Sequence, residues 1–246
     1  MGEKSVSEKP NALLIDMGNS QIKYTLIRDP KAAFEVSVAP NTDSLEVLIK
    51  LCDKVLISSV RDPQQVTAIA DLCRADGKLL QIIKTEAQTF GIECAYDHYQ
   101  TLGVDRWLAI LAARKITSLA VAVIDLGTAN TCDFIIGNKH IGGWIAPGFS
   151  TMRDSLIANT QRVFANNDYP SALKIGQSTE QCVNMGCIAA IQGLVSEAQH
   201  QLEMLTQGEN YRVIVTGGDK NLLGQCSKQA ILFQENLVLQ GLARYL

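Results

Sequence analysis

The sequence predicts an α/β fold that is built twice. Short apolar segments of strand length alternate with amphipathic segments of helix length. Two of the apolar segments end in the same kind of turn, and each of these turns is followed by a second strand. The repetition predicts two related lobes with a shared cleft, residues 11–117 and residues 118–246. Residues 1–10 are polar and of mixed charge, so we expect an extra or disordered segment there that is neither a signal peptide nor an anchor.

The first lobe is expected to open with a buried strand at residues 12–15, because the apolar run is not interrupted by polar residues. Further strands are expected at residues 22–27, 34–38 and 55–57. Apolar residues at helical spacing predict helices at residues 42–53, 63–76 and 104–114.

The second lobe repeats this order. Strands are expected at residues 121–124, 132–136, 140–145 and 211–215, with a hairpin turn at residues 137–139. A helix should begin near Thr151, and a terminal helix is expected at residues 235–246. A long helix is expected at residues 178–205, opened by a capping box between Ser178 and Gln181.

The two repeated turns carry the most information about function. In each, an Asp is followed two residues later by a Gly: Asp16 and Gly18 in the first turn, Asp125 and Gly127 in the second. Each turn joins two strands rather than a strand and a helix, and neither of the common glycine-rich nucleotide-binding motifs occurs in the chain. These are therefore not P-loops.

A turn made of glycine and small polar residues can direct several backbone N–H groups at one anion. The side chains of Asn19, Ser20, Thr128, Thr131 and Lys23 could add donors. A carboxylate beside a phosphate would hold a cation that bridges to it. The alternative is that each Asp only caps its own turn, which a single copy would favour. Two copies, and a later turn at residues 216–219, favour a nucleotide clamp.

The start of the helix at residue 104 is a second candidate site. Asp105 in the first turn would be favoured by the helix dipole, by about 0.3–1 kcal/mol, which is a purely structural role. In a functional role, Asp105 would accept a proton from a substrate hydroxyl, and Arg106 would bind a carboxylate or phosphate through two hydrogen bonds. The glycines of residues 142–148 indicate only a close approach to the backbone.

Composition excludes several classes of protein. Lys and Arg number 22 against 25 Asp and Glu, for a net charge of −3, which argues against a nucleic-acid-binding protein but not against a small anionic substrate. No apolar run is long enough to span a membrane. The seven cysteines are scattered without a Cys-x-x-Cys pair, which predicts reduced thiols in a cytoplasmic protein and no zinc site.

Taken together, four segments resemble type III pantothenate kinase, a bacterial family. They occur in the family's order and spacing, at residues 16–23, 103–106, 125–133 and 142–148. The family belongs to the actin-like superfamily of acetate and sugar kinases, so the resemblance implies two ribonuclease-H-like lobes. It also implies a cytoplasmic homodimer that phosphorylates the primary hydroxyl of pantothenate with ATP, in the first step of coenzyme A synthesis.

The resemblance also implies roles for individual residues. Asp105 would be the proton acceptor. Asp125 would bind a monovalent cation, K⁺ or NH₄⁺, and Asp16 would lie next to the Mg²⁺ of the nucleotide, directly or through water. ATP would be bound by Asp16, Met17, Gly18, Asn19, Ser20, Gln21, Ile22, Lys23 and Thr128. Pantothenate would be bound by Tyr96, Gly103, Val104, Asp105, Arg106 and Thr179. A cap of the long helix remains the alternative role of Thr179.

The chain departs from the family's pattern at two positions. Ser20 replaces the usual Thr and keeps its hydroxyl. Tyr99 stands where the family often has Pro, which leaves open whether Tyr96 or Tyr99 faces the substrate. Two rival functions are a sugar or acyl-phosphate kinase and a nucleotide-binding transcriptional regulator without turnover. Residues 103–106 together with Tyr96 argue against the other kinases, which would share the nucleotide clamp. The intact set of Asp16, Asp105 and Asp125 and the lack of a basic patch favour an enzyme over the regulator.

Overall fold

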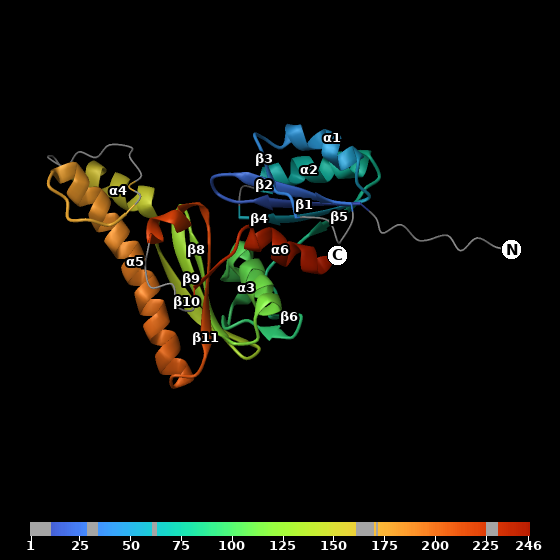
Figure 1. The fold of residues 1–246 in the computed structure, drawn as a ribbon. Helices are drawn as coiled ribbons and strands as arrows, with labels where there is room; N and C mark the ends of the chain where they lie inside the picture. The colour runs from blue at the N-terminus through green and yellow to red at the C-terminus, as the bar shows by residue number, and fades with distance from the viewer. Residues whose placement is uncertain (1–10, 29–33, 61–62, 161–169, 171, 225–230) are drawn as a thin grey trace. The chain divides into compact units, whose positions relative to one another are not determined.

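The computed structural model describes residues 11–28, 34–60, 63–160, 170, 172–224 and 231–246. They form two mixed β-sheets flanked by helices, which confirms the predicted fold class (Figure 1). By contacts the chain divides into two compact units. Unit 1 contains Met1–Thr85, Gln100–Leu108 and Val238–Leu246, and unit 2 contains Glu86–Tyr99 and Ala109–Leu237. The division after residue 117 stays a prediction, and the extra segment expected at residues 1–10 lies outside the described residues.

Unit 1 contains a five-stranded sheet in the order β3-β2-β1-β4-β5. The central strands β1 and β4 are almost wholly buried, and the residues in the middle of each are apolar, as expected for strands covered on both faces. β2 pairs with β1 antiparallel, and β4 pairs with β1 in parallel on the other side. The strands are β1 (Ala12–Met17), β2 (Ile22–Ile27), β3 (Ser37–Ala39), β4 (Lys54–Ser59) and β5 (Leu79–Ile82).

Two helices cover one side of this sheet, α1 (Glu46–Lys50) and α2 (Pro63–Ala75) (Figure 1). The helix predicted at residues 42–53 is shorter than expected, and a 3-10 turn, η1 (Asp43–Leu45), precedes it. The helix ends early because the backbone N–H groups of Asp53 and Lys54 donate to the carbonyl of Asn11. These two hydrogen bonds start the pairing of β4 with β1. The terminal helix of the chain is α6 (Leu237–Leu242), followed by η4 (Ala243–Tyr245).

Unit 2 contains a seven-stranded sheet in the order β12-β11-β8-β9-β10-β7-β6. The four strands predicted in this part of the chain are all present, and the turn at residues 137–139 joins β9 to β10 as expected. The short strands at the edges were not predicted. The strands are β6 (Gln88–Thr89), β7 (Ile92–Glu93), β8 (Ala120–Leu126), β9 (Ala129–Ile136), β10 (Lys139–Pro147), β11 (Tyr211–Thr216) and β12 (Ile231–Phe233).

The long helix α5 (Thr179–Thr206) packs along this sheet, with α4 (Phe149–Ala158) beside it (Figure 1). The Ser178 hydroxyl accepts a hydrogen bond from the backbone of Gln181 at 3.3 Å, so the predicted cap forms. The Gln181 side chain, however, accepts from the backbone of Gln177 rather than of Ser178. The buried face of α5 joins β8 and β11 in one apolar core through Ile188, Ile191, Val195, Ala198 and Leu202.

The two sheets repeat one arrangement at their centres. The hairpin β1–β2 has the parallel strand β4 on its other side, and the hairpin β8–β9 has the parallel strand β11 on its other side. The repeated Asp-x-Gly turns are the turns of these two hairpins, so the duplication inferred from sequence is present in the backbone.

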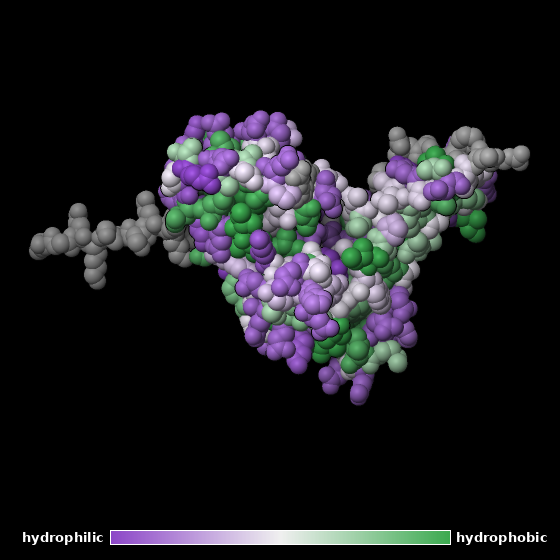
Figure 2. Space-filling model, turned by 180° about the vertical axis from the view of Figure 1, so that it is seen from behind, coloured by the Kyte–Doolittle hydropathy of each residue, from purple (hydrophilic) through white to green (hydrophobic). Residues whose placement is uncertain are grey.

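The described surface is mixed in character. On the face shown in Figure 2, apolar residues form several separate groups among polar ones. Within the described part of the chain, no helix combines the length and the apolar character needed to cross a membrane.

Candidate active site

The turn between β1 and β2 presents Asp16 at the carboxyl end of a buried strand. Asp16 lies opposite Lys23 of β2 and opposite Ser58 of β4 in the sheet register. The Ser58 hydroxyl donates to Asp16 Oδ1 at 3.2 Å, and Asp16 is half-buried. A carboxylate at this edge, flanked by exposed polar residues, fits a site for a cation and the phosphate it accompanies.

The residues of this turn divide into two kinds. Asn19, Ser20 and Gln21 are exposed, whereas Met17 and Ile22 are packed into the core of unit 1 with exposed fractions of 0% and 3%. Met17 and Ile22 could therefore contact a nucleotide only through their backbone atoms. A Cβ on Gly18 would meet only the carbonyl oxygen of Gln21, at an ordinary 3.5 Å. Packing within unit 1 thus does not require glycine at position 18.

The second predicted element of unit 1 is the start of α3 (Val104–Ile116). Asp105 Oδ1 accepts a hydrogen bond from the backbone N–H of Arg106 at 2.8 Å. The carboxylate is therefore folded back onto the first turn of the helix, where the helix dipole favours a negative charge. Arg106 is only 7% exposed and Val104 is buried.

The loop before α3 is tied down. The Thr85 hydroxyl, itself buried, donates to the carbonyl of Leu102 at 2.7 Å. The backbone N–H of Trp107 donates to the carbonyl of Gly103 at 3.1 Å. Such a fixed backbone can hold Asp105 in one orientation, which is what a group that aligns a substrate hydroxyl needs.

In unit 2, the turn between β8 and β9 is held against the start of α4. The backbone N–H of Gly148 and the hydroxyl of Thr151 both donate to the carbonyl of Thr128, at 3.0 and 2.7 Å. A Cβ on Gly148 would come within 1.7 Å of the carbonyl oxygen of Gly127. Glycine is therefore required at position 148, which explains part of the glycine-rich segment singled out in the sequence.

Asp125 lies at the carboxyl end of β8, where β11 also ends. The register pairs Asp125 with Thr216, and the next residue, Gly217, has φ of +98°. A Cβ on Gly217 would lie 2.1 Å from the carbonyl oxygen of Leu126 and 2.5 Å from Asp125 Oδ1, so the close backbone approach requires the glycine and the carboxylate also uses the space. Burial raises the pKa of nearby Asp219, in η3 (Gly218–Leu223), above its usual value. Carboxyl ends of neighbouring strands are a common place for ligands in α/β folds.

Tyr96 contacts a buried pair that the sequence did not single out. Its ring stacks on the His140 ring with centroids 6.1 Å apart, and His140 Nε2 lies 2.9 Å from Asp133 Oδ1. Tyr99 begins η2 (Tyr99–Thr101), and both tyrosines are half-buried. The only available signal was that His140, one of three histidines in the chain, falls inside a predicted strand.

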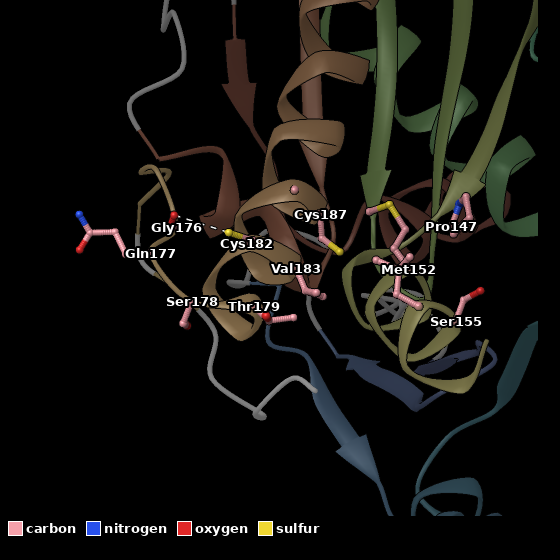
Figure 3. Close-up of a pocket in the computed structure, with 12 residues that line it drawn as sticks. Pro147, Met152, Ser155, Gly176, Gln177, Ser178, Thr179, Cys182, Val183 and Cys187 are labelled. Atoms are coloured by element: carbon pink, nitrogen blue, oxygen red, sulfur yellow. Dashed lines mark hydrogen bonds between the residues drawn. The ribbon is translucent and has the colours of Figure 1, made fainter. Parts of the chain in front are cut away.

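A cavity of about 1050 Å³ in unit 2 lies between the start of α5 and α4 (Figure 3). Thr179 and Val183 of α5 face it, and Met152 of α4 and Pro147 of β10 line the other side. The cap of α5 is Ser178, not Thr179, so the capping role that was the alternative for Thr179 is wrong. The Thr179 hydroxyl is therefore not needed for the cap.

The predicted residues fall in both units. Unit 1 holds the first turn, residues 16–23, and residues 103–106. Unit 2 holds Tyr96, Asp125, Thr128 and Thr179. Among the described residues no group of three or more His, Cys, Asp or Glu could hold a metal. A single carboxylate in each turn fits ions that also bind phosphate, because Mg²⁺ usually takes one or two protein carboxylates together with substrate oxygens.

Comparison with known proteins decides the family. A family model described as type III pantothenate kinase matches residues 12–201. The chain belongs to the type III pantothenate kinase family. A type III pantothenate kinase of Pseudoalteromonas atlantica is 46% identical over 246 residues, covering 98% of this chain and 99% of that protein. One from Pseudomonas putida is 34% identical, covering 94% of this chain and 97% of its own length.

A solved structure supports the fold of this type III pantothenate kinase family member. It is a Baf family transcriptional activator, by its name, from Campylobacter jejuni, and aligns with a TM-score of 0.59. The alignment covers 94% of this chain and 96% of that one at 20% identity. At that identity the likeness concerns the fold alone, so it does not favour the regulator over the kinase.

Proposed function

We propose that this protein transfers the γ-phosphoryl group of ATP to the primary hydroxyl of pantothenate, forming 4′-phosphopantothenate in the first step of coenzyme A synthesis. The proposal rests chiefly on Asp105, whose carboxylate is fixed at the start of α3 next to Arg106 in a chain of this family. Phosphoryl transfer needs alignment and charge stabilisation more than covalent chemistry from the protein. A carboxylate held by a backbone hydrogen bond at the start of a helix, with a buried arginine next to it in sequence, supports that role.

Each part of the site has a task in this reaction. Asp105 accepts the proton of the pantothenate hydroxyl and directs that oxygen at the phosphorus. Arg106, together with Tyr96 and Thr179 and the backbone of Gly103 and Val104, binds pantothenate. The nucleotide is bound by the backbone and polar side chains of residues 16–23 and by Thr128, with Met17 and Ile22 contributing backbone atoms only.

The two turn carboxylates hold the cations. Asp16, with Ser58 as its hydrogen-bond donor, lies beside the Mg²⁺ of the nucleotide, directly or through water. Asp125, in the space left by Gly217, binds K⁺ or NH₄⁺. When bound, these ions neutralise the charge of the phosphates.

The expected assembly is a cytoplasmic homodimer that binds neither nucleic acid nor membrane. The net charge of −3 supports the first exclusion, because a protein that binds the DNA backbone usually presents a basic surface. Sedimentation equilibrium of the purified full chain would measure the assembly. A mass of twice 26.8 kDa is expected, and a single chain mass would contradict the dimer.

The activity is tested by ADP release with ATP, Mg²⁺ and pantothenate, with and without K⁺. Turnover that requires pantothenate and rises with K⁺ is expected. Turnover with a sugar or acetate in place of pantothenate would favour another kinase of the superfamily. Absence of turnover together with DNA binding that persists at moderate salt would favour the regulator.

A further inference from the structure

We infer that His140 is a positioning residue that holds the Tyr96 segment in place for substrate. The inference rests on the proposed function, in which Tyr96 contacts pantothenate. His140 lies on β10 and is 2% exposed, and Asp133 on β9 is also 2% exposed. Their contact, and the contact of His140 with residues 95 and 96, all lie within unit 2.

A β-bulge turns His140 toward the interior. β9 and β10 pair regularly from Ala129 to Phe134, and the register then shifts between His140 and Gly142, where Gly142 has φ of +115°. Without the shift, Ile141 would lie opposite Ile135. With it, His140 takes that place, while Ile141 is 43% exposed. The bulge thus buries a histidine and exposes an isoleucine, a local arrangement that packing alone would disfavour.

The bulge also brings Asp133 within reach of the histidine. Asp133 lies opposite Gly143, two residues from Ile135, so it is the diagonal neighbour of His140 on the same face. A Cβ on Gly143 would lie 2.0 Å from the carbonyl oxygen of Cys132 and 2.8 Å from Asp133 Oδ1, so the glycine allows the close approach of the β9 backbone and leaves room for the carboxylate. His140 Nε2 then lies 2.9 Å from Asp133 Oδ1.

The other ring nitrogen of His140 faces the Tyr96 segment. The backbone N–H of Ala95 donates to His140 Nδ1 at 3.4 Å. Nδ1 must therefore be the acceptor, which leaves Nε2–H to donate to the Asp133 carboxylate, so the two contacts fix one tautomer. Asp133 orients the ring, the ring accepts from Ala95, and the ring stacks on Tyr96.

The same segment is also attached at the start of β10, two residues before Ala95. The backbone N–H of Glu93 donates to the carbonyl of Asn138 at 2.9 Å, and Glu93 pairs with Lys139 in the sheet. After residue 93 the short strand β7 ends; the backbone N–H of Cys94 donates to the carbonyl of Ala87 at 2.9 Å, and His140 supplies the next contact of the segment with β10. His140 thus contributes to the position of Tyr96 through its contacts with Ala95 and with the tyrosine ring itself.

Two substitutions separate positioning from stability. In His140→Gln, the amide nitrogen replaces Nε2, so the contact with Asp133 is kept and the acceptor for Ala95 is lost. In His140→Asn, the amide oxygen replaces Nδ1, so the acceptor for the Ala95 N–H is kept. The Nε2–H donor to Asp133 is lost. We expect His140→Gln to raise KM for pantothenate about threefold to tenfold, which corresponds to the free energy of one hydrogen bond. KM for ATP should not change. Compared with His140→Gln, His140→Asn should lower Tm more and should raise KM for pantothenate less.

Exchange of the Ala95 amide with deuterium gives a readout that needs no substrate. It should speed up in His140→Gln and stay slow in His140→Asn. Val195→Ala, on the buried face of α5, is the stability control: its Tm should fall while both KM values and the Ala95 exchange rate stay the same.

A double mutant tests whether His140 acts through Tyr96. In a Tyr96→Ala background, His140→Gln should add little to the rise in KM, because the ring it positions is gone. Equal effects of His140→Gln with and without Tyr96, or a normal KM in His140→Gln, would overturn the inference. A wild-type protein that does not phosphorylate pantothenate would instead refute the proposed function, and the Ala95 exchange would still test the attachment.

Discussion

The Asp105 carboxylate at the start of α3 occupies the space that a side chain on residue 103 would need, and residue 103 is a glycine. A Cβ on residue 103 would lie 2.5 Å from Asp105 Oδ1, closer than a Cβ atom packs against an oxygen. The carboxylate is held in this position by the hydrogen bond that it accepts from the backbone N–H of Arg106. Gly103 therefore allows the Asp105 carboxylate to take this position, although the glycine itself carries no functional group.

Gly103→Ala should consequently impair catalysis more than folding. Gly103 does not have positive φ, so alanine fits the backbone, but the Asp105 carboxylate has to move. Because a displacement near 1 Å in an aligned group can cost about 100-fold, we expect kcat to fall roughly tenfold to a hundredfold with Tm nearly unchanged. Steady-state ADP release and thermal melting measure the two effects.

Gly193→Ala is the matched control for Gly103→Ala. Gly193 lies in the middle of α5, and a Cβ there meets nothing within 4 Å. Tm should rise slightly, since alanine is the better helix former by about 1 kcal/mol, and kcat should not change. Equal kcat in both variants would show that the position of Asp105 is not critical.

Asp105→Asn tests the acid itself. The amide oxygen can still accept from the Arg106 backbone, so the start of α3 should stay intact. Loss of a general base reduces turnover by roughly 10²–10⁴, and we expect kcat to fall within that range while ATP binding, measured by calorimetry, persists. Near-normal turnover would remove Asp105 from the proton transfer.

Much of the fold and the site follows from local sequence. The hairpins around Asp16 and Asp125 were predictable because an apolar run, an Asp and a Gly in order specify a strand and a turn. The bulge at His140 was not predictable, because the residue at which the register shifts depends on how β10 pairs with β9, which the local sequence of β10 does not specify. The burial of Met17 and Ile22 depends on helices that pack over β1 and β2, so periodicity alone could not separate them from their exposed neighbours.

Asp125→Asn tests the cation. The substitution keeps the size of the side chain that fits against Gly217 and removes its charge. We expect KM for ATP to rise and the stimulation by K⁺ to disappear, measured by ADP release in K⁺ and in Na⁺. Asp71→Asn, at an exposed position of α2, should leave the K⁺ response unchanged. If Na⁺ serves as well as K⁺ in the wild type, Asp125 does not select the cation.

Asp219 should make the protein less stable at neutral pH. Burial raises the pKa of its carboxyl group, so the folded state holds the proton more tightly than the unfolded chain does. The free energy of unfolding therefore decreases as pH rises from the usual carboxyl pKa through the raised one. Asp219→Asn should melt above the wild type at pH 7, and the difference should shrink as pH is lowered toward that range. A variant that melts below the wild type at pH 7 would show that the carboxylate has a stabilising partner.

The cysteines should differ widely in reactivity, and the difference reports on the cavity near Thr179. Cys182 is exposed and lines the cavity, with its thiol 3.5 Å from the carbonyl oxygen of Gly176 (Figure 3). Burial raises the pKa of Cys52 and of Cys187, and that of Cys73 to about 11, so these thiols carry little thiolate at pH 8.

Iodoacetamide at pH 8 should therefore label Cys182 well before Cys52, Cys73 or Cys187, as peptide mass mapping would record. If Thr179 contacts pantothenate, saturating pantothenate should slow the labelling of Cys182, because its thiol lies one turn further along the same helix and lines the same cavity. Labelling of Cys182 with ATP alone is the control, because it shows whether ligand binding slows the labelling through a general loss of flexibility. Equal labelling with and without pantothenate would place the substrate away from this cavity and remove Thr179 from the binding residues.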